Sequence, residues 1–216
     1  MKKIKTNLLL SVFYFLLFFL WTFAVSTYDV KEIGPNNTRI GLSSLNTFVG
    51  DYVGESMELY EITDLLSVIP LLIVACFGAL GLYQLIKRKS FRKVDADLVA
   101  LGVFYLMTFS VFLIFEEFIV NYRPILIEGK AEASYPSSTT MLVLCVMSTA
   151  LMQFKMRIKN KIVFRCAKTA ILFFTVFMIL ARILSGVHWF SDIIGAFLFS
   201  FGLIKAYYTY ILFLHY

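Results

Sequence analysis

The stretch ARILSGVHWFSD, residues 181–192, guides the interpretation of the whole chain. It places Arg182, His188 and Asp192 among residues that are otherwise typical of a membrane-spanning helix. Charged groups in or near hydrocarbon are costly unless something compensates them, and those that occur usually serve a function. Each of the three side chains is therefore a candidate functional residue.

The spacing of His188 and Asp192 suggests chemistry at the imidazole. The two residues are four apart, so they share one face if the segment is helical. A carboxylate that accepts the proton of one ring nitrogen leaves the other nitrogen bare, as a nucleophile or a base. Gly186 allows a sharp turn before the histidine, and the guanidinium of Arg182 suits phosphate oxygens. The alternative is a buried Arg–Asp pair beside an interfacial histidine.

The composition excludes a soluble domain. The chain has 216 residues, 60% of them hydrophobic, and a mean hydropathy of +0.81. Apolar runs long enough to cross a hydrocarbon core of ~30 Å recur along it. We predict an all-α polytopic membrane protein, a six-transmembrane-helix bundle forming one domain over residues 1–216. The expected spans are residues 8–25, 65–85, 98–120, 139–152 (extending towards 154), 170–184 and 190–212.

The basic residues predict the orientation of the bundle. They gather at the amino end and in the loops after the second and fourth spans, whereas few lie in the opposite loops. The positive-inside rule therefore puts both termini in the cytoplasm. We expect the membrane to be a bacterial plasma membrane. The net charge of +6 then reflects topology and contact with anionic lipid, and no nucleic-acid partner is expected.

Residues 27–64 form the first outer segment. Within it, residues 45–62 mix aromatic and aliphatic side chains with acidic ones, a pattern that suits a helix lying in the outer interface and covering an active site. A plain connecting loop with some helix is the alternative.

Two further clusters are expected at the same outer level as His188. Arg123-Pro124 follows the third span, and Pro136-Ser137-Ser138-Thr139 directly precedes the fourth. Hydroxyl residues at a helix start cap it, and the free backbone N–H groups there bind anions. A phosphoryl-transfer site needs cations and backbone N–H groups for the phosphoryl oxygens, and a nucleophile for phosphorus. The two guanidiniums, the helix start and the Asp-supported histidine would supply them.

These clusters resemble the three motifs of the type 2 phosphatidic acid phosphatases and their haloperoxidase relatives, K-x6-R-P, P-S-G-H and S-R-x5-H-x3-D. Arg182, His188 and Asp192 meet the third motif, with Ala181 where Ser is usual. Arg123-Pro124 meets part of the first motif, and Pro136-Ser137 part of the second. The resemblance covers roughly residues 98–212.

The chain departs from the family pattern at two positions. Glu116 stands where the family has Lys, and Ser138-Thr139 stands where it has Gly-His. In the family that His is taken to protonate the leaving oxygen, and losing a general acid typically costs ~10²–10⁴ in rate. His215, the other histidine of the chain, is expected at the cytoplasmic end and cannot substitute.

The resemblance implies a phosphatase acting on a phosphorylated lipid at the outer leaflet. His188 would attack phosphorus to form a phosphohistidine, supported by Asp192. The phosphate would be held by Arg123, Ser137, Ser138, Thr139 and Arg182. No metal or cofactor is implied. A phosphotransferase and a non-catalytic protein that binds phosphorylated lipids remain alternatives, and the sequence indicates neither the lipid nor the oligomeric state.

Overall fold

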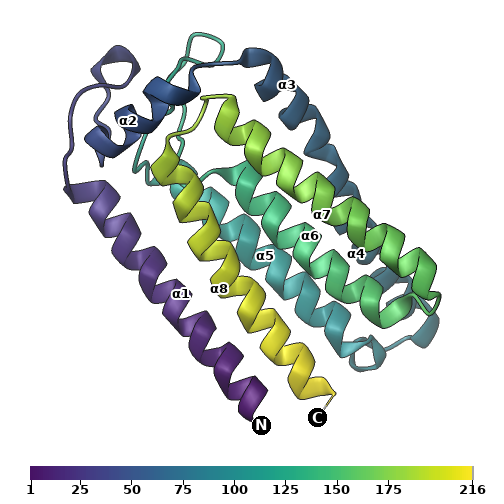
Figure 1. The fold of residues 1–216 in the computed structure, drawn as a ribbon. Helices are drawn as coiled ribbons and strands as arrows, with labels where there is room; N and C mark the ends of the chain where they lie inside the picture. The colour runs from purple at the N-terminus through teal and green to yellow at the C-terminus, as the bar shows by residue number, and fades with distance from the viewer. Residues whose placement is uncertain (216) are drawn as a thin grey trace.

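The structure, a computed structural model, describes residues 1–215 as an all-helical bundle (Figure 1). Within these residues, six helical segments are long and apolar enough to span a membrane. The prediction of a six-span integral membrane protein is therefore confirmed. The spans are α1 (Lys2–Thr27), α3 with α4 (Met57–Leu66 and Val68–Arg88), α5 (Ala96–Glu117), α6 (Ser138–Arg157), α7 (Lys161–Leu184) and α8 (Phe190–Leu214).

The remaining elements are short. They are α2 (Ser43–Val53) and the 3-10 turns η1 (Pro35–Asn37) and η2 (Phe91–Lys93). The largest difference from the expected boundaries lies in α7, which begins at Lys161 instead of residue 170. Its first turns carry Lys161, Arg165 and Lys168, so the helix extends beyond the apolar run. Asn160 caps this start, accepting hydrogen bonds from two backbone N–H groups of the first turn.

Helix α6 lies at the centre of the bundle, in contact with α4, α5, α7 and α8. The most apolar stretch of α6 is less hydrophobic than that of any other span, with a mean hydropathy of 1.3. It is also the most buried, with 61% of its residues inside the bundle. The two values belong together, because a helix surrounded by protein does not need an apolar surface towards lipid. Polar residues such as Thr149 and Gln153 are accordingly buried on it.

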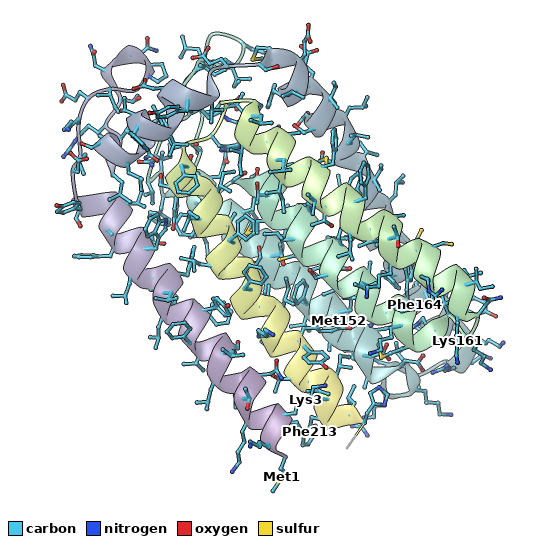
Figure 2. All side chains as sticks on the ribbon, in the orientation of Figure 1. Met1, Lys3, Met152, Lys161, Phe164 and Phe213 are labelled. Carbon is cyan, nitrogen blue, oxygen red and sulfur yellow. The ribbon has the colours of Figure 1, made fainter. Side chains whose placement is uncertain are left out.

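The two ends of the bundle have different characters. The starts of α1 and α7 and the end of α8 lie at one end, where Figure 2 labels Lys3, Lys161 and Phe213. Lys3 places its ammonium 5.4 Å from the ring centre of Tyr208 on α8. The opposite end carries α2, the start of α3, and the connections before α6 and α8 (Figure 1).

The outer segment contains two helices with a short connection between them, instead of one helix over residues 45–62. Helix α2 stops at Val53 because Gly54 adopts φ +70°, a left-handed conformation that favours glycine. Ser56 then caps α3 by accepting a hydrogen bond from the Leu59 N–H. Helix α3 continues through Ser67 directly into α4.

Aromatic packing fixes the connection that precedes α6. The ring of Tyr135 stacks on Phe18 of α1 and meets Phe115 of α5 edge to face. Its hydroxyl is 2.7 Å from that of Thr22. A side chain at position 195 of α8 would collide with this ring, so Gly195 lets the connection pack closely.

Candidate active site

His188 lies in the turn between α7 and α8, and not on a helix. Gly186 makes this turn possible with φ +66°. A Cβ at Gly186 would also collide with the carbonyl oxygen of Gly54. The backbone N–H of Ser56 donates to the carbonyl of Ser185 at 3.0 Å. The link between α2 and α3 thus lies directly against the turn that holds the histidine.

Asp192 occupies the first turn of α8 and is fully buried. Its carboxylate accepts hydrogen bonds from the Trp189 N–H at 2.9 Å and the Asn121 side-chain amide at 3.3 Å. A helix N-terminus favours a negative charge. Asn121 also accepts a hydrogen bond from the Gly41 N–H at 2.9 Å. Asp192 is therefore held by its own turn and by Asn121, which is itself held by Gly41.

Ser134 lies between His188 and Asp192. The imidazole Nδ1 is 3.8 Å from the Asp192 carboxylate, too far for a hydrogen bond, but 3.2 Å from the Ser134 hydroxyl. That hydroxyl donates its only proton to Asp192, so it must accept from Nδ1–H. The direct His–Asp hydrogen bond suggested by the spacing is thus replaced by a His188–Ser134–Asp192 chain.

This chain leaves the other ring nitrogen bare. His188 Nε2 is buried and has no hydrogen-bond partner among residues 1–215. Burial holds the pKa of His188 well below its usual range; the charges of Arg123 and Arg182 lower it further, and Asp192 opposes them. The ring is accordingly neutral at neutral pH, the form in which Nε2 carries a free electron pair.

If the site releases phosphate, as the motif resemblance implies, Ser134→Ala should lower kcat by roughly tenfold, because the imidazole loses one orienting hydrogen bond. Ser200→Ala is the matched control, since Ser200 is equally buried on α8 and its hydroxyl has no hydrogen-bond partner within residues 1–215. Initial rates of phosphate release from a lipid phosphate measure both variants. A Ser134→Ala enzyme as fast as the wild type would contradict the proton chain.

Arg182 is held at the end of α7 by helices α3 and α6. It is 1% exposed, and it donates to the Thr63 hydroxyl at 2.9 Å and to the Thr139 hydroxyl at 2.8 Å. The Asp64 carboxylate lies 4.0 Å away and is mostly exposed. Among residues 1–215 the Nε atom of Arg182 has no hydrogen-bond partner.

Arg123 reaches the site from the connection between α5 and α6. Paired backbone bonds close this connection, Arg123 N–H to Glu132 at 3.0 Å and Ser134 N–H to Asn121 at 2.9 Å. The side chain is 9% exposed, and its Nε lies 3.2 Å from the Glu132 carboxylate. Its Nε and Nη1 make no properly aligned hydrogen bond within the described chain.

The start of α6 lies at the same end of the bundle as His188, as expected, but the Ser137 hydroxyl does not face a free site. Ser137 is fully buried; its hydroxyl bonds that of Thr140 at 3.0 Å, and its N–H bonds the Asp192 carbonyl at 3.1 Å. Its side chain thus already has a partner within the protein. The helix begins at Ser138, so the first-turn N–H groups, including that of Thr139, have no partner within the helix.

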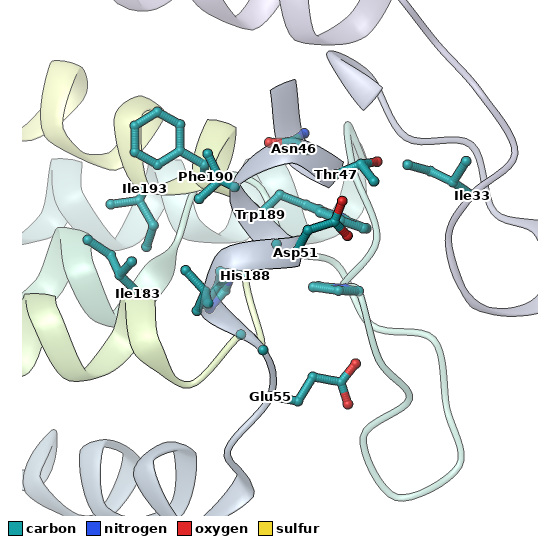
Figure 3. Close-up of a pocket in the computed structure, with 16 residues that line it drawn as sticks. Ile33, Asn46, Thr47, Asp51, Glu55, Ile183, His188, Trp189, Phe190 and Ile193 are labelled. Carbon is teal, nitrogen blue, oxygen red and sulfur yellow. The ribbon is translucent and has the colours of Figure 1, made fainter. Parts of the chain in front are cut away.

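Two cavities meet at His188. One, of about 280 Å³, is lined by His188 together with Arg123, Ser134, Ser138, Glu116 and Glu132. The other, of about 340 Å³, lies under α2, where Figure 3 shows Asp51 and Glu55 near His188 and Trp189. The first cavity combines the histidine, a guanidinium and a helix start, as a phosphate site requires. Among residues 1–215, no group of three or more His, Cys, Asp or Glu is placed to hold a metal ion.

The motifs identified most of the groups that the fold brings together, but they missed several supporting residues. These are Ser134, Asn121, Tyr60 and Thr63. Asn121 and Ser134 are polar residues at the two ends of the connection that carries Arg123. Their position there is a weak sequence signal for a role in the site. Tyr60 and Thr63 are one turn apart on α3, far in sequence from every motif.

The chain resembles known proteins in sequence and in fold. The model of the PAP2 superfamily matches residues 117–215. The fold is similar to a crystal structure described as the first transmembrane PAP2-type phosphatidylglycerolphosphate phosphatase, from Bacillus subtilis. The two share 19% identity with a TM-score of 0.59, over 95% of this chain and 96% of that one. No curated protein matches the sequence.

The residues that match the PAP2 superfamily model, 117–215, include Arg123, Arg182, His188 and Asp192. The family indicated by the three motifs is thereby confirmed, and so is the fold, that of a transmembrane PAP2 protein.

Proposed function

We propose that the protein is a membrane lipid-phosphate phosphatase that works through a phosphohistidine on His188. One observation carries the proposal. His188, whose Nε2 has no hydrogen-bond partner among residues 1–215, lines one cavity with the buried Arg123. The buried Arg182 shares the ring of Tyr60 with Arg123. A nucleophile beside cations that hold phosphoryl oxygens is the arrangement that phosphoryl transfer needs.

The reaction would proceed in two displacements. The Nε2 electron pair attacks phosphorus, the bond from phosphorus to the lipid oxygen breaks, and that oxygen takes up a proton. The resulting imidazolium is supported through Ser134 by Asp192. Water then attacks phosphorus, the P–N bond breaks, and inorganic phosphate leaves. Arg123, Arg182 and the N–H groups of Ser138 and Thr139 would hold the phosphoryl oxygens.

The proton for the lipid oxygen cannot come from Thr139. Its hydroxyl accepts a hydrogen bond from Arg182, and an aliphatic alcohol is a poor acid. Two carboxyl groups, Glu116 and Glu132, line the same cavity as His188 and are the groups available as donors. A lipid diphosphate needs less protonation of its leaving group, so it would be the faster substrate if neither carboxyl serves.

Phosphate release by the purified protein tests the function. The panel is phosphatidic acid, phosphatidylglycerophosphate and a polyprenyl diphosphate in detergent micelles. Release from at least one lipid is expected. Tight binding of these lipids without any phosphate release would favour a non-catalytic lipid-binding protein, the alternative to which the Glu116 and Thr139 departures point. Transfer of phosphate to an added alcohol would favour a phosphotransferase.

We further propose that the site faces outward and that both termini are cytoplasmic, in a bacterial plasma membrane. The basic loops after α4 and α6 lie at the same end of the bundle as the termini, and His188 lies at the other. The positive-inside rule supports this orientation.

A labelling experiment checks the orientation. Lys130 and Lys159 are both exposed and lie at opposite ends of the bundle. With the three native cysteines replaced by serine, Lys130→Cys should react with a membrane-impermeant maleimide in intact cells, whereas Lys159→Cys should react only after permeabilisation. The reverse pattern would place the site on the cytoplasmic side.

A further inference from the structure

Helix α3 forms one wall of the site, although it lies outside the part of the chain that matches the family model. It packs against the end of α7 (Figure 1). Arg182 donates to the Thr63 hydroxyl at 2.9 Å and lies 3.5 Å from the carbonyl oxygen of Tyr60. The position of this guanidinium therefore depends on α3.

Tyr60 contacts both arginines of the site through one ring. The guanidinium carbon of Arg182 lies over the ring at 4.9 Å from its centre, and that of Arg123 at 5.6 Å. These are cation–π distances. The two arginines come from different parts of the chain, and Tyr60 is the aromatic residue that they share.

A ring suits this position better than a carboxylate would. Two buried like charges repel each other, and a carboxylate that relieved the repulsion would occupy the N–H donors that a phosphoryl group needs. The negative face of an aromatic ring attracts a cation without accepting its N–H groups as a carboxylate does. Within residues 1–215, Arg182 Nε and Arg123 Nη1 have no hydrogen-bond partner, and Arg123 Nε makes no aligned bond to the Glu132 carboxylate 3.2 Å away.

We propose that Tyr60 is a positioning residue that holds Arg123 and Arg182 converged on the phosphoryl group through its ring and not through its hydroxyl. The proposal rests on the proposed function only in taking the ligand to be a phosphoryl oxyanion. It predicts that the ring sets the affinity of the site for tetrahedral oxyanions even when no reaction takes place.

Binding of orthovanadate to the purified protein, measured by calorimetry, tests this proposal. Tyr60→Phe should bind within about twofold of the wild type, because the ring remains. Tyr60→Leu should bind about tenfold more weakly, because both cation–π contacts are lost. Tyr52→Leu is the matched control: Tyr52 lies on the same outer segment, is highly exposed, and pairs with Phe48 instead.

Tyr60→pentafluorophenylalanine separates charge from shape. The fluorinated ring keeps nearly the same shape, but its face no longer attracts cations, so this variant should also bind vanadate about tenfold more weakly. Wild-type affinity in the fluorinated variant, or a tenfold loss in Tyr60→Phe, would overturn the proposal.

The proposed function can fail separately. Vanadate binding with the predicted ring dependence, but no phosphate release from any lipid, would refute catalysis and support the role of Tyr60. A wild-type protein that binds no vanadate would refute both.

Discussion

Replacing His188 by alanine is expected to lower phosphate release from the best lipid substrate by at least about 10⁴-fold, because removing a covalent nucleophile leaves only the binding groups of the site. The variant should still bind vanadate, since Arg123, Arg182 and the start of α6 remain. The measurement is the initial rate of phosphate release from detergent micelles.

His215→Ala provides the matched control for this prediction. His215 is the other histidine of the chain and follows α8 at the end of the bundle away from the site. This variant should retain nearly full activity. If His188→Ala released phosphate at a rate within tenfold of the wild type, His188 would not be the nucleophile.

Arg182→Ala is expected to have the second-largest effect, a loss of about 10²–10³-fold in kcat. Arg182 is the most deeply buried cation of the site, and the negative charge that develops on the phosphoryl oxygens would lose its stabilisation there. Arg182→Lys should recover only part of the rate, because an ammonium cannot bond Thr63 and Thr139 while presenting a fork to phosphate.

Arg157→Ala controls for general damage to the fold. Arg157 is also paired, with Asp97 at 2.7 Å, but it lies at the opposite end of α6. This variant should lower the unfolding temperature while the rate per folded molecule stays close to that of the wild type. An Arg182→Ala enzyme with only a threefold loss of kcat would remove Arg182 from the phosphate site.

The sequence predicted the fold well because the membrane imposes a simple rule. A segment that crosses hydrocarbon must be apolar for its whole length and must satisfy its own backbone hydrogen bonds as a helix. The errors lie where that rule does not apply. Helix α7 extends into a basic segment from Lys161, and the outer segment breaks at Gly54, outside the hydrocarbon, where local backbone conformation decides.

The residues of the candidate site that belong to a motif could be predicted from the sequence. Arg123, Arg182 and His188 all reach the same end of the bundle. The spacing did not reveal that Ser134 lies between His188 and Asp192, because that contact depends on how the connection before α6 folds back. Nor did it reveal that Thr139, which stands at the position of the family's acid, accepts a hydrogen bond from Arg182. Contacts between residues distant in the chain leave no periodic pattern to find.

The most direct test of the account is to trap the covalent intermediate. Wild-type protein mixed with radiolabelled lipid phosphate and quenched within milliseconds should carry label on the protein that is stable to base and lost in acid, as expected of a phosphohistidine. The His188→Ala variant should carry none. Label of the same stability on His188→Ala, or rapid turnover by the wild type with no trapped label under any quench, would contradict a phosphohistidine at His188.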